Sequence, residues 1–214
     1  DAQESRGLGD VYKRQELERF LDEIFAKCNI QISVKTRLGM EDASGFPELM
    51  KLYNKFPMKE LIIHPRVQKD FYKNTPNLEM FAEAFAMSTN PVCYNGDIFC
   101  VEDHQRICER FPELDAVMSG RGTLTNPALA REIRGGQALT KAELRKFHDL
   151  VYHTYRAEVS GDRNVLFKMK ELWFYMGPLF ANNKKYLKKI KKSEKCIVYE
   201  SAVAELFSNE ELIL

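Results

Sequence analysis

Four polar clusters interrupt the first two thirds of this sequence, and their residue types suit the binding of a phosphate or of an electron-rich ring. Each cluster follows a short apolar run with the composition of a β-strand. Cationic side chains stabilise negative charge, and glycine-rich turns expose backbone N–H groups to phosphate oxygens. In chain order, the clusters are Lys35, His64, Asn95-Gly96-Asp97 and Gly120-Arg121-Gly122.

Each cluster also has a plain structural explanation. Lys35 can be a solvated lysine at a strand end, and His64 can be an ordinary structural histidine. The Asn-Gly-Asp and Gly-Arg-Gly triplets are both common in turns. Because the two triplets follow consecutive strands, one unit apart, their combination favours a phosphate site over two unrelated turns.

The elements that must position these clusters alternate between strand and helix. Such alternation predicts an α/β fold with a parallel sheet, in which the chemistry lies at the carboxyl ends of the strands. Four strand–helix units amount to the C-terminal half of a (β/α)8 TIM barrel. Strands are predicted near 32–34, 61–63, 92–94 and 116–118, and helices over 16–27, 46–53, 76–87 and 101–110.

The pattern changes after Gly135-Gly136, which end a helix that Asn126-Pro127 begins. Residues 140–214 contain helical patterns alone, and the first has Thr140 and Glu143 at the spacing of a capping box. We therefore predict a half TIM barrel over residues 16–136, followed by a small all-helical domain over residues 137–214.

The first fifteen residues differ from the rest. They are polar, interrupted by glycine and aperiodic, and the string GLGDVYKRQ resembles a translated sequencing adapter. We expect residues 1–15 to be a non-native or disordered leader, and the chain to be a truncated C-terminal fragment of a longer protein.

The composition is that of a soluble globular protein. Of the 214 residues, 29% are charged and 44% hydrophobic, the net charge is +1, and no apolar run reaches the length of a membrane span. The five cysteines are odd in number and form no CxxC pair, which favours reduced thiols in the cytoplasm. Their spacing predicts no metal site.

Positive charge is concentrated in the helical part. Six of the nine residues 184–192 are lysines, with Tyr186 and Leu187 between them. Lysine clusters with an aromatic residue suit a nucleic-acid backbone, although the same run can be a solvated helix face. The candidate contacts with a nucleic-acid backbone are Arg163, Lys168, Lys170, Lys184, Lys185 and Lys188.

Four strings, SVKTRLG, IIHPRV, YNGDI and MSGRGTLTNP, closely resemble in order and spacing the second half of the tRNA-dihydrouridine synthase family. A fifth, NVLFKMKELWFYMG, resembles a segment of that family's helical domain. The resemblance covers about residues 16–207. It implies an FMN-binding (β/α)8 barrel followed by a helical tRNA-binding domain. It further implies that NADPH reduces the FMN, which then reduces the C5–C6 bond of a uridine in tRNA. No membrane or obligate protein partner is indicated.

The resemblance also implies roles for the polar clusters. Lys35 resembles the family's lysine that contacts the flavin ring, and His64 the histidine of its HGRT-like motif, although Pro65 stands where the family has a glycine. Asn95, Gly96 and Asp97 match the motif on the FMN side chain. Gly120 and Arg121 match the pair that binds the FMN phosphate.

The family's catalytic cysteine lies in an Asn-Gly-Cys-Pro-like string, and no such string occurs here. We therefore assign no catalytic residue to this chain and expect it to be inactive alone. Two other functions stay open. Another FMN- or phosphate-binding TIM-barrel oxidoreductase predicts no basic helical appendage, and a non-catalytic RNA-binding protein predicts no bound flavin.

Overall fold

The computed structural model describes residues 2–213, which form two compact units. The first, here called the sheet unit, runs to Asp97 and includes Ile107–Met118. The second, the helical unit, comprises Ile98–Arg106 and the chain from Ser119 onward. Each unit has its own packing and is described by itself.

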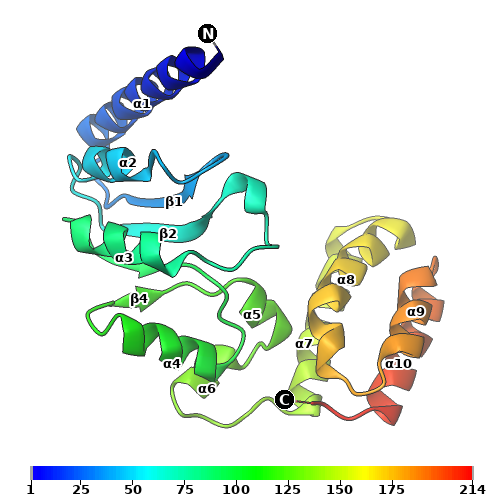
Figure 1. Cartoon of the computed structure of the whole chain (residues 1–214). Helices are drawn as coiled ribbons and strands as arrows, with labels where there is room; N and C mark the ends of the chain where they lie inside the picture. Colours follow the sequence, from blue (N-terminus) through cyan, green and yellow to red (C-terminus); the bar gives the residue numbers. More distant parts are fainter. Residues whose placement is uncertain (1, 214) are drawn as a thin grey trace. The chain divides into compact units, whose positions relative to one another are not determined.

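A parallel sheet of four strands forms the centre of the sheet unit in the described part of the chain (Figure 1). The strand order β1-β2-β3-β4 follows the sequence, and every neighbouring pair is parallel. Parallel neighbours require crossover helices, which explains the alternation seen in the sequence. The predicted half-barrel fold class is confirmed. The strands are β1 Ser33–Gly39, β2 Glu60–Val67, β3 Val92–Tyr94 and β4 Ala116–Val117.

Aromatic side chains hold helices α2 (Phe46–Tyr53) and α3 (Leu78–Met87) against one face of the sheet. Phe81 of α3 is fully buried and meets the rings of Tyr94 and Phe111 edge-on, with ring centroids 5.0 Å apart in each pair. Thr36 of β1 shares a 3.1 Å hydrogen bond with the Tyr53 hydroxyl at the end of α2. The helices and the short 3-10 turn are α1 Ala2–Lys27, α2 Phe46–Tyr53, η1 Gln68–Asp70 and α3 Leu78–Met87, and α4 Val101–Arg110 crosses the division between the units.

Helix α1 takes in residues that we predicted to be a leader. It runs from Ala2 to Lys27 and so joins residues 2–15 to the predicted helix 16–27. A helical backbone does not decide whether that segment is native, so its origin stays a prediction.

The helical unit packs around one aromatic core. The Trp173 indole N–H donates a 2.7 Å hydrogen bond to the Tyr199 hydroxyl, which also lies 2.6 Å from Nε2 of buried His148. Thr140 and Glu143 form the predicted capping box at the start of α7. The elements are α5 Arg121–Thr125, α6 Leu129–Ile133, α7 Lys141–Glu158, α8 Asp162–Met176, η2 Gly177–Leu179, α9 Lys184–Lys192 and α10 Cys196–Asn209.

The predicted domain boundary at Gly135-Gly136 lies within the helical unit. Ala128 and Leu139 belong to the same buried cluster as Trp173, and Arg131 pairs with Glu143 across the glycines. The glycines end a helix without ending the core, because the residues on both sides of them bury apolar surface together. Within the described residues, no helix is long and apolar enough to cross a membrane.

Candidate functional site

Lys35 and His64 lie inside strands, not after them. We predicted that these strands end near residues 34 and 63, which was wrong, because β1 continues to Gly39 and β2 to Val67. The extension comes from pairing of the two strands beyond the apolar runs, with Arg37 opposite His64. Tertiary pairing of this kind overrides local strand preference.

An irregularity in β2 accommodates Pro65. Between Arg37 and Gly39 the first strand advances two residues, while β2 advances three, from His64 to Val67. One extra residue on one strand is the signature of a β-bulge, where proline is tolerated because a ladder N–H is not required. The Pro65 carbonyl instead accepts a 2.7 Å hydrogen bond from the Asn77 N–H.

The strand register places the predicted flavin-contacting residues on one face of the sheet. Lys35 pairs with Ile62, and Arg37 with His64, so these side chains project from the face opposite Thr36 and its partner Tyr53. Burial, helped by the neighbouring Arg37 cation, lowers the pKa of Lys35. The face therefore carries concentrated positive charge at the carboxyl end of β1.

Arg66 connects His64 to Asp97. Its side chain is 1% exposed, and the guanidinium makes a bidentate ion pair with the Asp97 carboxylate. It also donates to the Asn74 carbonyl, and its Nη1 lies 3.0 Å from Nε2 of His64. A charged group this deeply buried is stable only when its donors are satisfied. The ion pair therefore ties β2 to the Asn-Gly-Asp loop.

His64 is held neutral. Burial lowers its pKa to about 4, and the nearby cations Arg37, Arg66 and Lys35 act in the same direction, against Asp97. A guanidinium has N–H donors and no acceptor, so Arg66 donates and Nε2 of His64 accepts. The imidazole proton then resides on Nδ1. At neutral pH, His64 is an N–H donor with a fixed tautomer.

The Asn-Gly-Asp loop is held by the same part of the sheet unit. The Asn95 backbone N–H donates to the Ile63 carbonyl at 2.9 Å, and its side-chain amide donates to the Met118 carbonyl at 2.8 Å. A Cβ on Gly96 would lie 2.0 Å from the Tyr94 hydroxyl. Close approach of the tyrosine explains why this position is a glycine.

Gly120 and Arg121 belong to the helical unit. They lie at the start of the short helix α5, with the Arg121 guanidinium 5.3 Å from the centre of the Phe99 ring. A Cβ on Gly122 would lie 1.9 Å from the Ile98 carbonyl oxygen, so this glycine permits close backbone packing. The phosphate role of Gly120 and Arg121 stays a prediction.

Helix α9 presents the predicted lysine cluster. It buries Tyr186 and Ile190 and leaves all six lysines exposed. Two of these have intramolecular partners, because Lys189 pairs with Glu205 and the Lys185 ammonium lies 4.5 Å from the centre of the Tyr186 ring. On α8, Arg163 and Lys168 are exposed, whereas Lys170 is half-buried and donates to the Ser193 carbonyl at 2.6 Å.

Comparison with known sequences decides the family. The sequence model of the family described as Dihydrouridine synthase (Dus) matches residues 7–210. The chain belongs to the dihydrouridine synthase family. The match includes both the sheet unit and the helical unit, as well as part of the segment we interpreted as a leader.

Individual dihydrouridine synthases are similar over shorter stretches. The tRNA-dihydrouridine(16) synthase of Shewanella oneidensis is 35% identical over 49% of this chain and 33% of its own length. That of Pseudomonas syringae pv. tomato is 31% identical over 51% of this chain and 34% of its own. That of Vibrio parahaemolyticus is 24% identical over 78% and 52%. The chain therefore spans between a third and about half of these relatives.

Two residues of this dihydrouridine synthase chain were missed as site residues by sequence reasoning. The first is Arg66, which the sequence could have indicated, because it stands two positions after His64 and because its ion-pair partner Asp97 was already a candidate site residue. Arg37 is the second, and its guanidinium donates a 3.0 Å hydrogen bond to the Val67 carbonyl. Spacing along a chain does not show which cation is buried.

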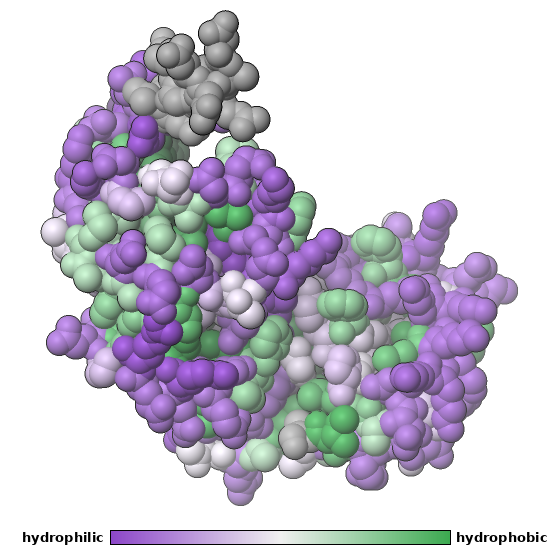
Figure 2. Space-filling view, viewed as in Figure 1, coloured by the Kyte–Doolittle hydropathy of each residue, from purple (hydrophilic) through white to green (hydrophobic). Residues whose placement is uncertain are grey.

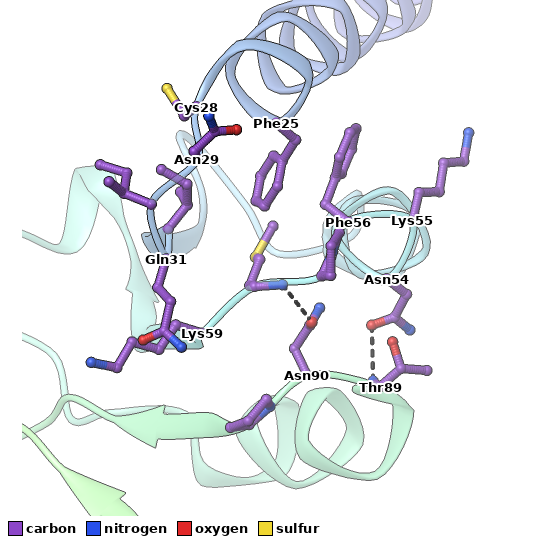
Figure 3. Close-up of a pocket in the computed structure, with 15 residues that line it drawn as sticks. Phe25, Cys28, Asn29, Gln31, Asn54, Lys55, Phe56, Lys59, Thr89 and Asn90 are labelled. Carbon is purple, nitrogen blue, oxygen red and sulfur yellow. Dashed lines mark hydrogen bonds between the residues drawn. The ribbon is translucent and has the colours of Figure 1, made fainter.

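A pocket of about 780 Å³ opens at the opposite, amino-terminal end of the strands (Figure 3). Ring stacking of Phe25 on Phe56 and hydrogen bonds from loop amides to Asn54 and Asn90 define its walls. In TIM barrels the amino-terminal face contributes stability, while catalysis lies at the other end. We therefore place the candidate site of this chain at the end that carries His64.

Proposed function

We propose that this chain is the FMN- and tRNA-binding part of an enzyme that reduces uridine to 5,6-dihydrouridine in tRNA with NADPH as reductant. The proposal rests on the face at the carboxyl ends of β1 and β2, where the cations Lys35 and Arg37 lie beside the neutral His64, in a chain of this family. When bound, FMN would supply the redox chemistry, and the protein would supply orientation and electrostatics.

The residues present suit a flavin. An FMN molecule combines an anionic phosphate with a ring whose carbonyl and nitrogen atoms accept hydrogen bonds, and Lys35 supplies a cation on the same face as His64. Neutral His64 supplies a directed Nδ1 N–H, since Arg66 occupies Nε2. We propose Lys35, His64, Asn95, Gly96 and Asp97 as FMN-contacting residues, with Asp97 positioned by Arg66. Gly120 and Arg121 are proposed as phosphate contacts.

The helical unit is proposed to bind tRNA. Its helix α9 exposes six lysines on one short segment, and counterion release on binding of phosphates favours contact with nucleic acid. A uridine within folded tRNA must leave its stack to be reduced, so a second contact surface is needed to hold the RNA.

Two titrations of the purified chain test this function. Binding of FMN is measured by quenching of flavin fluorescence, and binding of unmodified tRNA is measured by filter binding. The proposal predicts binding of both. Binding of tRNA without flavin would favour a non-catalytic RNA-binding protein, and binding of flavin without tRNA would favour another TIM-barrel oxidoreductase.

An activity assay with FMN, NADPH and unmodified tRNA tests whether the chain reduces uridine on its own. None of the five cysteines stands in the string that carries the family's catalytic cysteine, so we expect no dihydrouridine from this chain alone. Formation of dihydrouridine would contradict that assignment.

A further inference from the structure

Helix α8 exposes two phenylalanines in line with two cations. Its other face is buried in the core through Val165, Met169 and Trp173. Residues that follow one another at intervals of four, three and four positions lie on the same side of a helix, and four residues of α8 have this spacing. The stripe consists of Arg163, Phe167, Lys170 and Phe174.

The two phenyl rings are unusually open to solvent. Phe167 is 69% exposed and Phe174 is 76% exposed, although each could gain free energy by burial. The Lys168 ammonium lies 6.0 Å from the centre of the Phe167 ring, and the Tyr175 ring meets Phe174 edge-on at 5.2 Å. Each ring therefore keeps a free face beside a polar or aromatic neighbour. Figure 2 shows apolar side chains scattered among hydrophilic ones on the visible surface of the helical unit.

A pocket borders the stripe. It has a volume of about 460 Å³ and is lined by Arg163, Leu166, Lys170, Ser193 and Glu194. The hydrogen bond from Lys170 to the Ser193 carbonyl fixes the stripe to the carboxyl-terminal end of α9, next to Lys191 and Lys192. Aromatic rings, a pocket and surrounding cations thus occupy one continuous surface of the helical unit.

We propose that Phe167 and Phe174 stack on unpaired bases of the tRNA substrate, while Arg163 and the α9 lysines contact its phosphates. The inference rests on the proposed tRNA-binding function and names the feature of the RNA that the surface recognises. Single-stranded bases are held by stacking on aromatic side chains within a positively charged surface, whereas a duplex offers no free base faces. The cations beside the rings favour RNA over an apolar protein partner.

The test compares tRNA with a fully paired RNA duplex of the same length. The variant F167L/F174L keeps apolar side chains and removes both rings, and F167W/F174W keeps a stacking surface. Phe20→Leu on α1 is a matched control, because that ring is also exposed, at 59%. Circular dichroism checks that each variant is folded. Filter binding at several salt concentrations gives the affinity for each RNA.

We expect F167L/F174L to lower tRNA affinity about fivefold or more for each ring removed, with little change in duplex affinity or in the salt slope. F167W/F174W and Phe20→Leu should bind as the wild type does. Equal tRNA affinity of wild type and F167L/F174L would overturn the inference and leave the proposed function intact, and so would equal losses for tRNA and duplex. Absence of tRNA binding by the wild-type chain would overturn both.

Discussion

Arg66→Met removes the charged centre of the candidate site while keeping a long, flexible apolar side chain. The change removes the hydrogen bonds that Arg66 donates to three groups, namely the Asp97 carboxylate, Nε2 of His64 and the Asn74 carbonyl. Arg110→Met is the matched control, since Arg110 also lies in the sheet unit and pairs with Glu79, with 39% and 81% of their side chains exposed.

The expected loss of folding free energy in each variant follows from how deeply its ion pair is buried. Removing one partner of a buried ion pair costs about 3–5 kcal/mol, because the other charge is left unpaired. The Asp97 side chain is 31% exposed and can recruit water, so we expect the lower end, about 3 kcal/mol. An exposed pair such as Arg110–Glu79 is worth about 0–1 kcal/mol.

Hydrogen exchange followed by mass spectrometry measures this difference locally. Trp173 lies in the helical unit, so its fluorescence would not report on the sheet unit directly. Peptides that contain β2 and the Asn95–Asp97 loop should exchange faster in Arg66→Met by about a hundredfold, the equivalent of about 3 kcal/mol. Peptides from α10 serve as an internal reference. Equal protection in Arg66→Met and Arg110→Met would refute the assignment of Arg66 as the buried link of the site.

Arg121→Ala should weaken FMN binding by about 1.5–3 kcal/mol, measured as flavin retained after gel filtration, and unchanged retention would remove Arg121 from the phosphate site. K184Q/K188Q/K191Q should weaken tRNA binding and make the log–log salt dependence shallower by about 0.9 for each duplex phosphate that is no longer neutralised; FMN binding should not change, and an unchanged slope would mean a merely solvated helix face. Because the pKa of His64 is lowered to about 4 in the fold, its contribution to stability is complete above the unfolded value near 6.5 and is lost as the pH falls through 4. Urea midpoints of wild type and His64→Gln should therefore diverge between these pH values, and parallel curves would contradict the neutral, buried imidazole.

The sequence predicts the elements well where local signals and packing agree. The helix over 101–110 and the capping box at Thr140 are found where predicted, because helical periodicity and a polar cap are both encoded within a few residues. Helix α5 was missed, since Arg121–Thr125 is short and contains a glycine and two threonines, which form helices poorly on their own. Its packing against α8 supplies the stability that the local sequence lacks.

The candidate site is predictable only in outline. Motifs identify His64 and the Asn95–Asp97 loop, but the strand extension beyond residues 34 and 63 depends on pairing between β1 and β2. The central role of Arg66 depends on its being buried between His64 and Asp97, which residue type alone does not indicate. Residue type likewise does not indicate that the Lys170 ammonium donates to the Ser193 carbonyl, and the predicted RNA contact of Lys170 stays a prediction.

The proposed function depends first on binding of FMN by the face that carries Lys35. The most direct measurement is the Kd for FMN, from fluorescence quenching, of the wild-type chain, Lys35→Met and Lys59→Met. Lys59 is an exposed lysine just before the amino-terminal end of β2, so its loss changes the net charge equally at the other end of the sheet. We expect Lys35→Met to weaken FMN binding about tenfold or more and Lys59→Met to bind FMN as the wild type does. Equal Kd values for the two variants would contradict it.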